Sequence, residues 1–278
     1  MAVIDSQVHV YEADTPERPW VHKITGPAHA TGEEQVAAMD ALGIDGAIIV
    51  STYTTYRYDS SYAQLVHARH PGRFALVKPV DPTNPAVAEQ IADWADQPGA
   101  VGVRIMLAFA ETRDPADPGL NLVLAESARR DLPVCVFATR HLDAARTLIA
   151  QNPDTVVVID HVGLPQMHLR EGENIWEDLP KVLALAQFDN VRIKLSGAGT
   201  MSRQPFPYDD LWEPMLRIID AYGVDRCLWG SDWTRAVDSL SYQQAVDSIR
   251  QSNRLSDSDR AMLMGGSTER TFRWSPTR

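Results

Sequence analysis

The sequence predicts a single α/β domain over residues 1–278, folded as a (β/α)8 TIM barrel with a helical extension at its C-terminal end. Short runs rich in β-branched residues alternate with longer helical patterns, and this alternation occurs eight times along the chain. The strand segments are near-continuously apolar, as expected for parallel strands covered on both faces by crossover helices. Eight such units in about 250 residues fit a closed barrel better than an open sheet.

The elements can be assigned in chain order. The expected strands are residues 2–10, 46–52, 73–80, 99–107, 132–139, 155–163, 190–199 and 225–233. The helices expected to follow them are residues 31–43, 60–70, 85–97, 120–130, 141–151, 174–187, 208–223 and 240–252. The first helix has the clearest ends, because Thr31 and Glu34 form a capping-box pattern and Gly43 is a typical stop.

Two further segments complete the predicted barrel. Residues 256–274 are expected to form an extra helix and tail that close one end. Residues 11–30 form a long loop after the first strand, where it would cover substrate at the active face. An open doubly wound sheet is the alternative, but it requires a glycine-rich phosphate-binding turn after the first strand, where this chain reads DSQVHVYEAD.

Composition and charge narrow the class of protein. The residues are 44% hydrophobic and 23% charged, with a formal net charge of −11, which argues against nucleic acid or an anionic membrane as a partner. Cys135 and Cys227 both lie in apolar runs, which indicates buried, reduced thiols. With no secretory signal pattern and no apolar run of membrane-spanning length, we expect a cytoplasmic protein that acts on a small molecule.

Polar residues stand where five of the expected strands end, which is where the active site of such a barrel lies. They are Gln7, His9, Arg104, Asp160, His161, Lys194, Ser196, Ser231, Asp232 and Trp233. Each has a structural explanation when taken alone: Arg104 and Lys194 can pair with a carboxylate such as Asp5 or Asp160, for example. Together they favour a functional site, because burying so many ionisable groups without use is costly.

The segments IDSQVHV, GVRIM, VVIDHVG, VRIKLSG and LWGSDW, in this order, resemble the amidohydrolase superfamily. Within it they are most similar to the branch of 2-pyrone-4,6-dicarboxylate lactonase and related sugar-acid lactonases. The family usually begins with D-x-H-x-H, and this chain departs from that motif at Gln7. The resemblance places His9 at the second histidine of the motif, His161 at the strand-six histidine and Asp232 at the strand-eight aspartate.

Gln7 bears on whether a metal is used. A catalytic zinc normally takes three protein ligands and prefers imidazole or carboxylate to a neutral amide. One alternative is a single zinc or manganese ion held more weakly by His9, His161 and Asp232. The resemblance also implies a route without any cofactor, because the lactonase branch includes members that work without metal. We favour this second alternative, since an amide N–H donates a hydrogen bond in any protonation state.

The resemblance therefore implies metal-independent hydrolysis of a lactone that carries a carboxylate. Asp232 is expected to act as general base toward water, while His9, His161 and Gln7 donate hydrogen bonds to the carbonyl. Arg104, assisted by Lys194, is expected to bind the substrate carboxylate, because a guanidinium does so bidentately. The residues expected to wall the pocket are Tyr53, Trp20, His22 and Trp233.

Three other activities remain open on the sequence. A lactone isomerase would use the same carbonyl activation, with a substrate hydroxyl attacking in place of water. A metal-dependent amidohydrolase or decarboxylase would need a better ligand than Gln7, since decarboxylases of this fold tend to carry Glu-x-His at that position. A catalytically inactive binding barrel is the third alternative. Against it, His9, Arg104, His161 and Asp232 are all retained.

Overall fold

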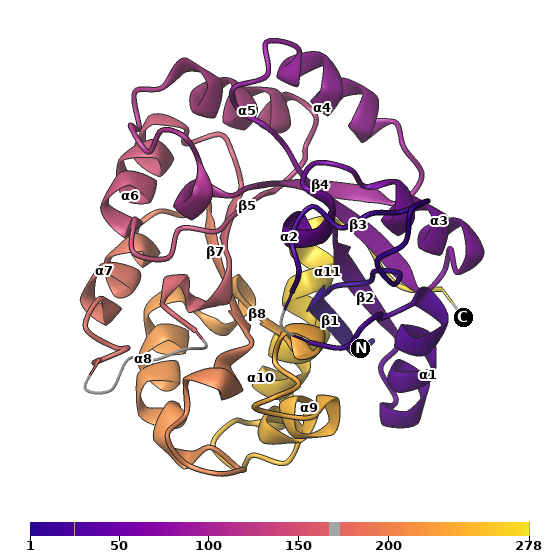
Figure 1. The fold of residues 1–278 in the computed structure, drawn as a ribbon. Helices are drawn as coiled ribbons and strands as arrows, with labels where there is room; N and C mark the ends of the chain where they lie inside the picture. Colours follow the sequence, from indigo (N-terminus) through magenta and orange to yellow (C-terminus); the bar gives the residue numbers. More distant parts are fainter. Residues whose placement is uncertain (25, 167–172, 278) are drawn as a thin grey trace.

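The structure is a computed structural model that describes residues 1–24, 26–166 and 173–277, and it confirms the parallel eight-stranded barrel (Figure 1). Its strands follow one another around the barrel in chain order. They are β1 (Ile4–Val8), β2 (Gly46–Val50), β3 (Phe74–Pro79), β4 (Ala100–Ile105), β5 (Val134–Val136), β6 (Val157–Ile159), β7 (Val191–Ser196) and β8 (Cys227–Gly230). The end of β8 returns to β1, where the Asp232 N–H donates to the Gln7 carbonyl at 2.9 Å.

A helix or short helical turn follows each strand. The helices are α1 (Gly32–Leu42), α2 (Tyr53–Tyr56), α3 (Ser61–Arg69), α4 (Val87–Ala95), α5 (Pro118–Arg129), α6 (Leu142–Gln151), α7 (Leu179–Ala184), α8 (Trp212–Tyr222), α9 (Tyr242–Arg250), α10 (Asp257–Ala261) and α11 (Ser267–Phe272). The predicted capping box at Thr31 and Glu34 is present, and Gly43 ends α1 with φ 65°. The helix expected at 174–187 begins later, at Leu179, with Pro180 in its first turn, where a missing N–H costs least.

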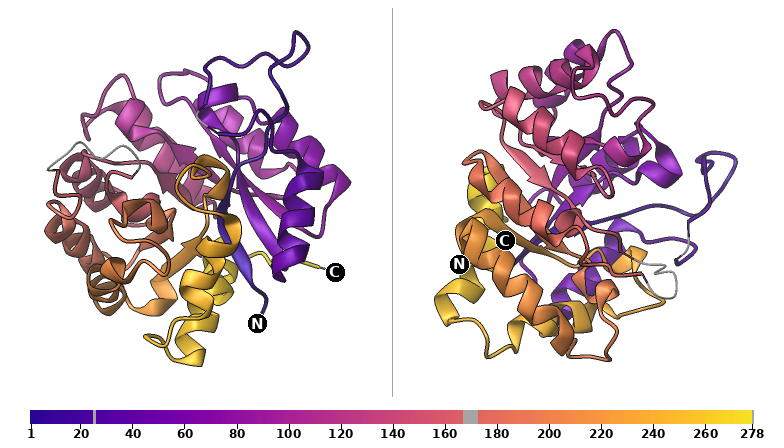
Figure 2. Two further views of the ribbon diagram at one scale, coloured as in Figure 1. Left: turned by 60° about the horizontal axis from the view of Figure 1, so that its bottom comes forward. Right: turned by 90° about the vertical axis from the view of Figure 1, so that its left-hand side faces the viewer.

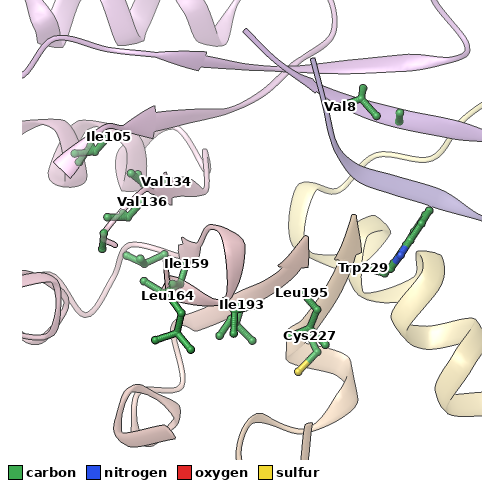
Figure 3. Packing of buried hydrophobic residues seen from close by; sticks show 14 of the residues in the cluster. Val8, Ile105, Val134, Val136, Ile159, Leu164, Ile193, Leu195, Cys227 and Trp229 are labelled. Carbon is green, nitrogen blue, oxygen red and sulfur yellow. The ribbon is translucent and has the colours of Figure 1, made fainter. Parts of the chain in front are cut away.

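Successive side chains of each strand point alternately outward, into a core beneath the helices, and inward, into the barrel interior. Outward side chains of consecutive strands pack in the layer between sheet and helices, as Figure 3 shows for Val134, Ile159, Ile193 and Trp229 among others. The residues between them on each strand face inward, because successive side chains point to opposite faces. One part of the interior is an apolar cluster made by Ile48, Val50, Ala75, Val77, Cys135, Val158, Leu228 and Phe272. The polar residues His9, His161 and Asp232 lie just beyond the carboxyl ends of β1, β6 and β8.

The two additional segments lie at opposite ends of the barrel (Figure 2). Helices α10 and α11, joined by a π-helical turn at Met262–Gly266, place Phe272 in the interior cluster and so close one end, as expected. The described part of loop 11–30 contains no helix or strand; Thr25 lies outside the described residues. Paired backbone hydrogen bonds of 2.8 Å between Tyr11 and Ala30 bring its two ends together.

Two further expectations can be compared with the structure. Cys135 and Cys227 are both buried free thiols, as predicted. Burial raises the pKa of the Cys135 thiol to about 11, which makes it a poor nucleophile. Within the described ranges, the model contains no helix with the length and apolarity needed to cross a bilayer.

Candidate active site

A cleft of about 370 Å³ opens at the carboxyl ends of the strands. Five residues singled out from the sequence line it: His9, Tyr53, Arg104, His161 and Asp232. The other lining residues are Thr52, Thr54, Met106, Phe109, Phe137, Thr139, Arg140, Leu164, Pro165, Gln166 and Arg235. The strand ends therefore converge on one mouth, as the pattern of polar residues predicted.

Strained backbone turns point two of these side chains at the mouth. His161 and Asp232 follow directly on β6 and β8 and have φ values of 52° and 51°. Val162 also has a positive φ, 60°, which is rare for a β-branched residue. Such strain persists only where surrounding structure enforces it, and it clusters at functional sites. The turns bring Asp232 within 3.6 Å of His161 Nδ1 and 3.4 Å of His9 Nε2.

Hydrogen-bond partners determine the tautomer of His9. Its Nδ1 lies 2.6 Å from the Val50 carbonyl, which can only accept, so Nδ1 carries the proton. Burial, with the charges of Arg104 and Arg235, holds the pKa of His9 well below its ordinary value, so the ring is neutral. Its Nε2 is therefore an acceptor, and the Gln7 side-chain amide lies 3.3 Å from it.

His161 is held in a matching way. Arg104 Nη2 lies 3.3 Å from its Nε2, and a guanidinium can only donate, so this nitrogen accepts. Burial lowers the pKa of His161 to about 3, although the Asp160 carboxylate acts in the opposite direction. In the neutral ring the proton is then on Nδ1, which lies 3.0 Å from Ser196 Oγ. The N–H of each imidazole is thus directed at a protein atom, Val50 O for His9 and Ser196 Oγ for His161. The sequence led us to expect these N–H groups to face a substrate carbonyl.

Lys194 and Gln7 were expected to contact substrate, and the structure places both beneath the cleft, outside its lining. Both are fully buried. Lys194 Nζ donates to Gln7 Oε1 at 2.7 Å and pairs with Asp160 Oδ1 at 3.1 Å. Lys194 precedes Ser196 by two residues on β7, so its side chain lies one inward-facing position deeper in the barrel. Its positive charge is therefore neutralised inside the protein. The Gln7 side-chain amide faces His9 Nε2, 3.3 Å away.

Arg104 shares the same buried carboxylate. Its Nε donates to Asp160 Oδ2 at 2.7 Å, while its guanidinium still reaches the cleft. Burial opposes ionisation of Asp160, but Arg104 and Lys194 outweigh it and hold the pKa of that carboxyl well below its ordinary range. The structural explanation of these two cations, pairing with Asp160, is therefore confirmed for both. Arg104 differs from Lys194 in that it also lines the cleft.

Asp232 has the electrostatics of a general base. Burial raises the pKa of its carboxyl to about 7, even though the Arg235 and Arg104 charges act to lower it. Its Oδ1 is buried and accepts no hydrogen bond from any described residue. A carboxylate that changes protonation near neutral pH and keeps a lone pair free is suited to removing a proton from water.

Arg235 is the main lining residue that the sequence reasoning missed. It ends the helical turn Trp233–Arg235 directly after β8, and its Nη1 is buried with no hydrogen-bond partner among the described residues. A scan for basic residues within a few positions of the strand ends would have found it. Arg140, which pairs with Glu173 at the rim, and the rings of Phe109 and Phe137 were also missed.

Three predicted pocket walls lie elsewhere. Trp233 donates to Gln35 at 3.0 Å and stacks on Tyr242, so it supports the turn after Asp232 and does not face the cleft. Trp20 packs edge-on against Tyr11 within the long loop. His22 lines an adjoining groove of about 700 Å³ that shares Tyr53, Thr54 and Phe109 with the cleft.

The donor set does not fit a divalent cation in this arrangement. The nitrogens left without a proton, His9 Nε2 and His161 Nε2, already face the hydrogen-bond donors of Gln7 and Arg104. Within the described residues, no group of three or more His, Cys, Asp or Glu side chains is placed to hold a metal ion. The Arg104 and Arg235 guanidinium groups add positive charge to the same space, which disfavours a cation further.

Comparisons with known proteins show the family of this chain and agree with its fold. The chain is 31% identical to 4-sulfomuconolactone hydrolase of Rhizobium radiobacter over 82% of its own length and 74% of that protein. It is also 31% identical to L-fucono-1,5-lactonase of Burkholderia ambifaria, over 69% of this chain and 65% of that protein.

Among solved structures, an amidohydrolase from Burkholderia multivorans with bound HEPES matches with a TM-score of 0.82 at 22% identity, over 98% of this chain and 99% of that one. Another crystal form of the same target contains bound zinc. At this identity the match shows the fold alone. The family model described as amidohydrolase matches residues 4–274. The chain therefore belongs to the amidohydrolase family of enzymes.

Proposed function

We propose that this enzyme hydrolyses a lactone that carries an anionic group, without a metal ion. The observation that carries the proposal is Asp232, a buried carboxyl with a pKa of about 7 at the centre of an arginine-lined cleft. The names of the two relatives, a sulfomuconolactone hydrolase and a fuconolactonase, support the same reaction class. Both names describe an enzyme that acts on a lactone.

The reaction begins at Asp232. Its carboxylate takes a proton from a water molecule, and the resulting hydroxide adds to the lactone carbonyl carbon. The tetrahedral intermediate then breaks the ring C–O bond, and Asp232 returns its proton to the leaving oxygen. The products are a carboxylic acid, which loses its proton to solvent, and a hydroxyl or enol group on the same molecule.

Arginines are better placed than histidines to stabilise the oxyanion. The imidazole nitrogens that lack a proton are acceptors, and the Nδ1–H groups of His9 and His161 lie against Val50 and Ser196. Arg235 Nη1 has no hydrogen-bond partner in the described part of the chain, and Arg104 retains guanidinium protons beyond those used for Asp160 and His161. Losing one such donor typically costs about 2.7–4 kcal/mol in barrier height. We assign Arg104 and Arg235 to the oxyanion and the substrate anion, with His9, His161 and Gln7 as positioning residues.

The test is a panel of carboxylate- and sulfonate-bearing lactones assayed with and without a strong chelator. Ring opening is followed by acid release, and the product is identified by mass. A gain of one water without loss of activity in chelator supports the proposal. A product of unchanged mass would identify a lactone isomerase instead, and loss of carbon dioxide would identify a decarboxylase. Activity that requires added zinc or manganese would overturn the metal-free mechanism.

A further inference from the structure

We propose that the natural substrate carries a planar aromatic or conjugated substituent, bound by three rings that extend outward from the cleft. The rings are those of Tyr53, Phe109 and Phe137, named here the aromatic ladder. The inference rests on the proposed lactone hydrolysis for the inner part of the cleft. It adds a second subsite for the substituent.

The aromatic ladder is continuous from the catalytic residues to the rim. Phe137 meets His161 edge-on at 5.7 Å between ring centroids. Phe109 stacks on Phe137 at 5.6 Å with 28° between the planes, and Tyr53 stacks on Phe109 at 6.3 Å with 5° between the planes. The three residues come from separate strand ends, after β5, β4 and β2, so the stack is assembled only by the closed barrel.

Exposure of the middle ring points to a ligand. Phe109 is 61% exposed, although it is flanked by two other rings. It sits on a single helical turn, Leu107–Phe109, at the border between the cleft and the adjoining groove. An exposed aromatic ring at the mouth of a binding cavity is stabilised when an apolar group of the ligand packs against it.

The available space exceeds what one small ring needs. The cleft of about 370 Å³ holds Asp232 and the arginines, and the groove of about 700 Å³ continues from it past Tyr53 and Phe109 to Tyr58. A monocyclic lactone bound at Asp232 would leave the groove unused. Because the two spaces share the Tyr53 and Phe109 walls, a substituent leaving the lactone in this direction would lie along the aromatic ladder.

The positive charge of Arg104, at the inner end of the aromatic ladder, would determine how the substrate is oriented. The Arg104 guanidinium carbon lies 5.6 Å from the centre of the Phe137 ring, so the cation and the first ring are neighbours. A substrate anion held by Arg104 or Arg235 would then present its planar substituent to Phe137 and Phe109. The substrate class that fits is an aryl- or alkenyl-substituted lactone acid.

Two matched pairs of compounds test the inference. Benzylsuccinate and methylsuccinate carry the same two carboxylates and cannot be hydrolysed, so calorimetric binding of the pair reports the subsite without catalysis. Butyrolactone carboxylates bearing benzyl or methyl at the same carbon report turnover. We expect wild type to prefer the benzyl member of each pair by at least about tenfold. We expect Phe109→Ala to remove most of that preference and Phe109→Tyr to restore it.

Leu122→Ala serves as the control variant, because Leu122 is an exposed apolar residue on the outer helix α5 and should leave the preference unchanged. Equal affinities for the two succinates, no binding of benzylsuccinate, or a preference that survives Phe109→Ala would each overturn the aromatic subsite. If the succinate preference is present and neither lactone is opened, the subsite stands and the proposed hydrolysis fails.

Discussion

Lys194 Nζ donates a 2.7 Å hydrogen bond to Gln7 Oε1, and this contact determines which way the glutamine amide faces. An ammonium cannot accept, so the atom near it must be the amide oxygen and the NH2 group must face His9 Nε2. A buried cation thus sets the orientation of the residue that replaces the first histidine of the family motif. The same ammonium pairs with Asp160, which also accepts from Arg104.

Lys194→Met should destabilise the barrel strongly. The substitution leaves Asp160 partly uncompensated and Gln7 Oε1 without its donor, both in the interior. Removing one partner of a buried ion pair typically costs about 3–5 kcal/mol in free energy of unfolding. Urea denaturation of the variant measures this. Lys181→Met is the control, because Lys181 forms an exposed pair with Asp143 and its loss should leave the melting temperature nearly unchanged. Equal stability of wild type and Lys194→Met would show that the buried pair is not stabilising.

Asp232→Asn should lower kcat by at least about 100-fold, since it removes the proposed general base. It should not lower stability above neutral pH. A pKa raised from 3.8 to about 7 means that folding favours the protonated carboxyl, so ionisation costs stability as pH rises through that interval. The variant escapes this cost, so its stability relative to wild type should increase between pH 4 and pH 7. Unfolding at several pH values, with exposed Asp220→Asn as control, measures the difference. A variant that keeps most of its kcat would rule out Asp232 as the base.

Activity should depend on the ionised form of Asp232. We expect kcat/KM to fall on the acid side of a single midpoint near pH 7, because only the carboxylate can accept a proton from water. Arg235 lowers the pKa of this group, so Arg235→Gln should move the midpoint to higher pH in addition to weakening catalysis. Arg140→Gln provides the comparison: Arg140 also lines the cleft but is paired with Glu173 at the rim, so its loss should not move the midpoint. A midpoint unaffected by Arg235→Gln would contradict the assigned electrostatics.

Removal of metal should leave activity intact. Protein dialysed against a chelator should contain substoichiometric metal by elemental analysis and retain its kcat, because the free imidazole nitrogens already face Gln7 and Arg104. Gln7→His is the informative companion variant, since it replaces an amide donor with a third imidazole and should raise the zinc content. Chelated wild-type enzyme that recovers activity only with zinc or manganese would show instead that a metal displaces these contacts.

Periodicity made the barrel and the location of its site predictable. Alternating strand and helix patterns depend on local spacing, and the ends of parallel strands must meet at one mouth whatever the loops do. His9, Arg104, His161 and Asp232 could therefore be placed together before any coordinates were known. The closing role of residues 256–274 followed from the same pattern, and Phe272 confirms it.

The role of each cation was harder to assign, and Lys194 illustrates why. The sequence shows that Lys194 and Ser196 share one face of a strand, but the level of each along the barrel axis depends on the register between strands. In the register between β7 and β8, Lys194 lies opposite Leu228 and Ser196 lies opposite Gly230. The Lys194 ammonium is therefore one layer below the mouth of the barrel. There it meets Asp160 and Gln7 instead of a substrate.

Periods of two and 3.6 residues along the chain predict the barrel, the order of its elements and the residues that meet at its mouth. The folded structure was needed to show which nitrogen of His9 carries the proton, which charges neutralise one another and which arginine keeps a nitrogen without a partner among the described residues. Those properties depend on contacts such as His9 with Val50 and Arg104 with Asp160, which join strands far apart in sequence. Hydrogen bonds and ion pairs act over a few ångströms in space. Their partners therefore depend on how the closed barrel brings distant strands together.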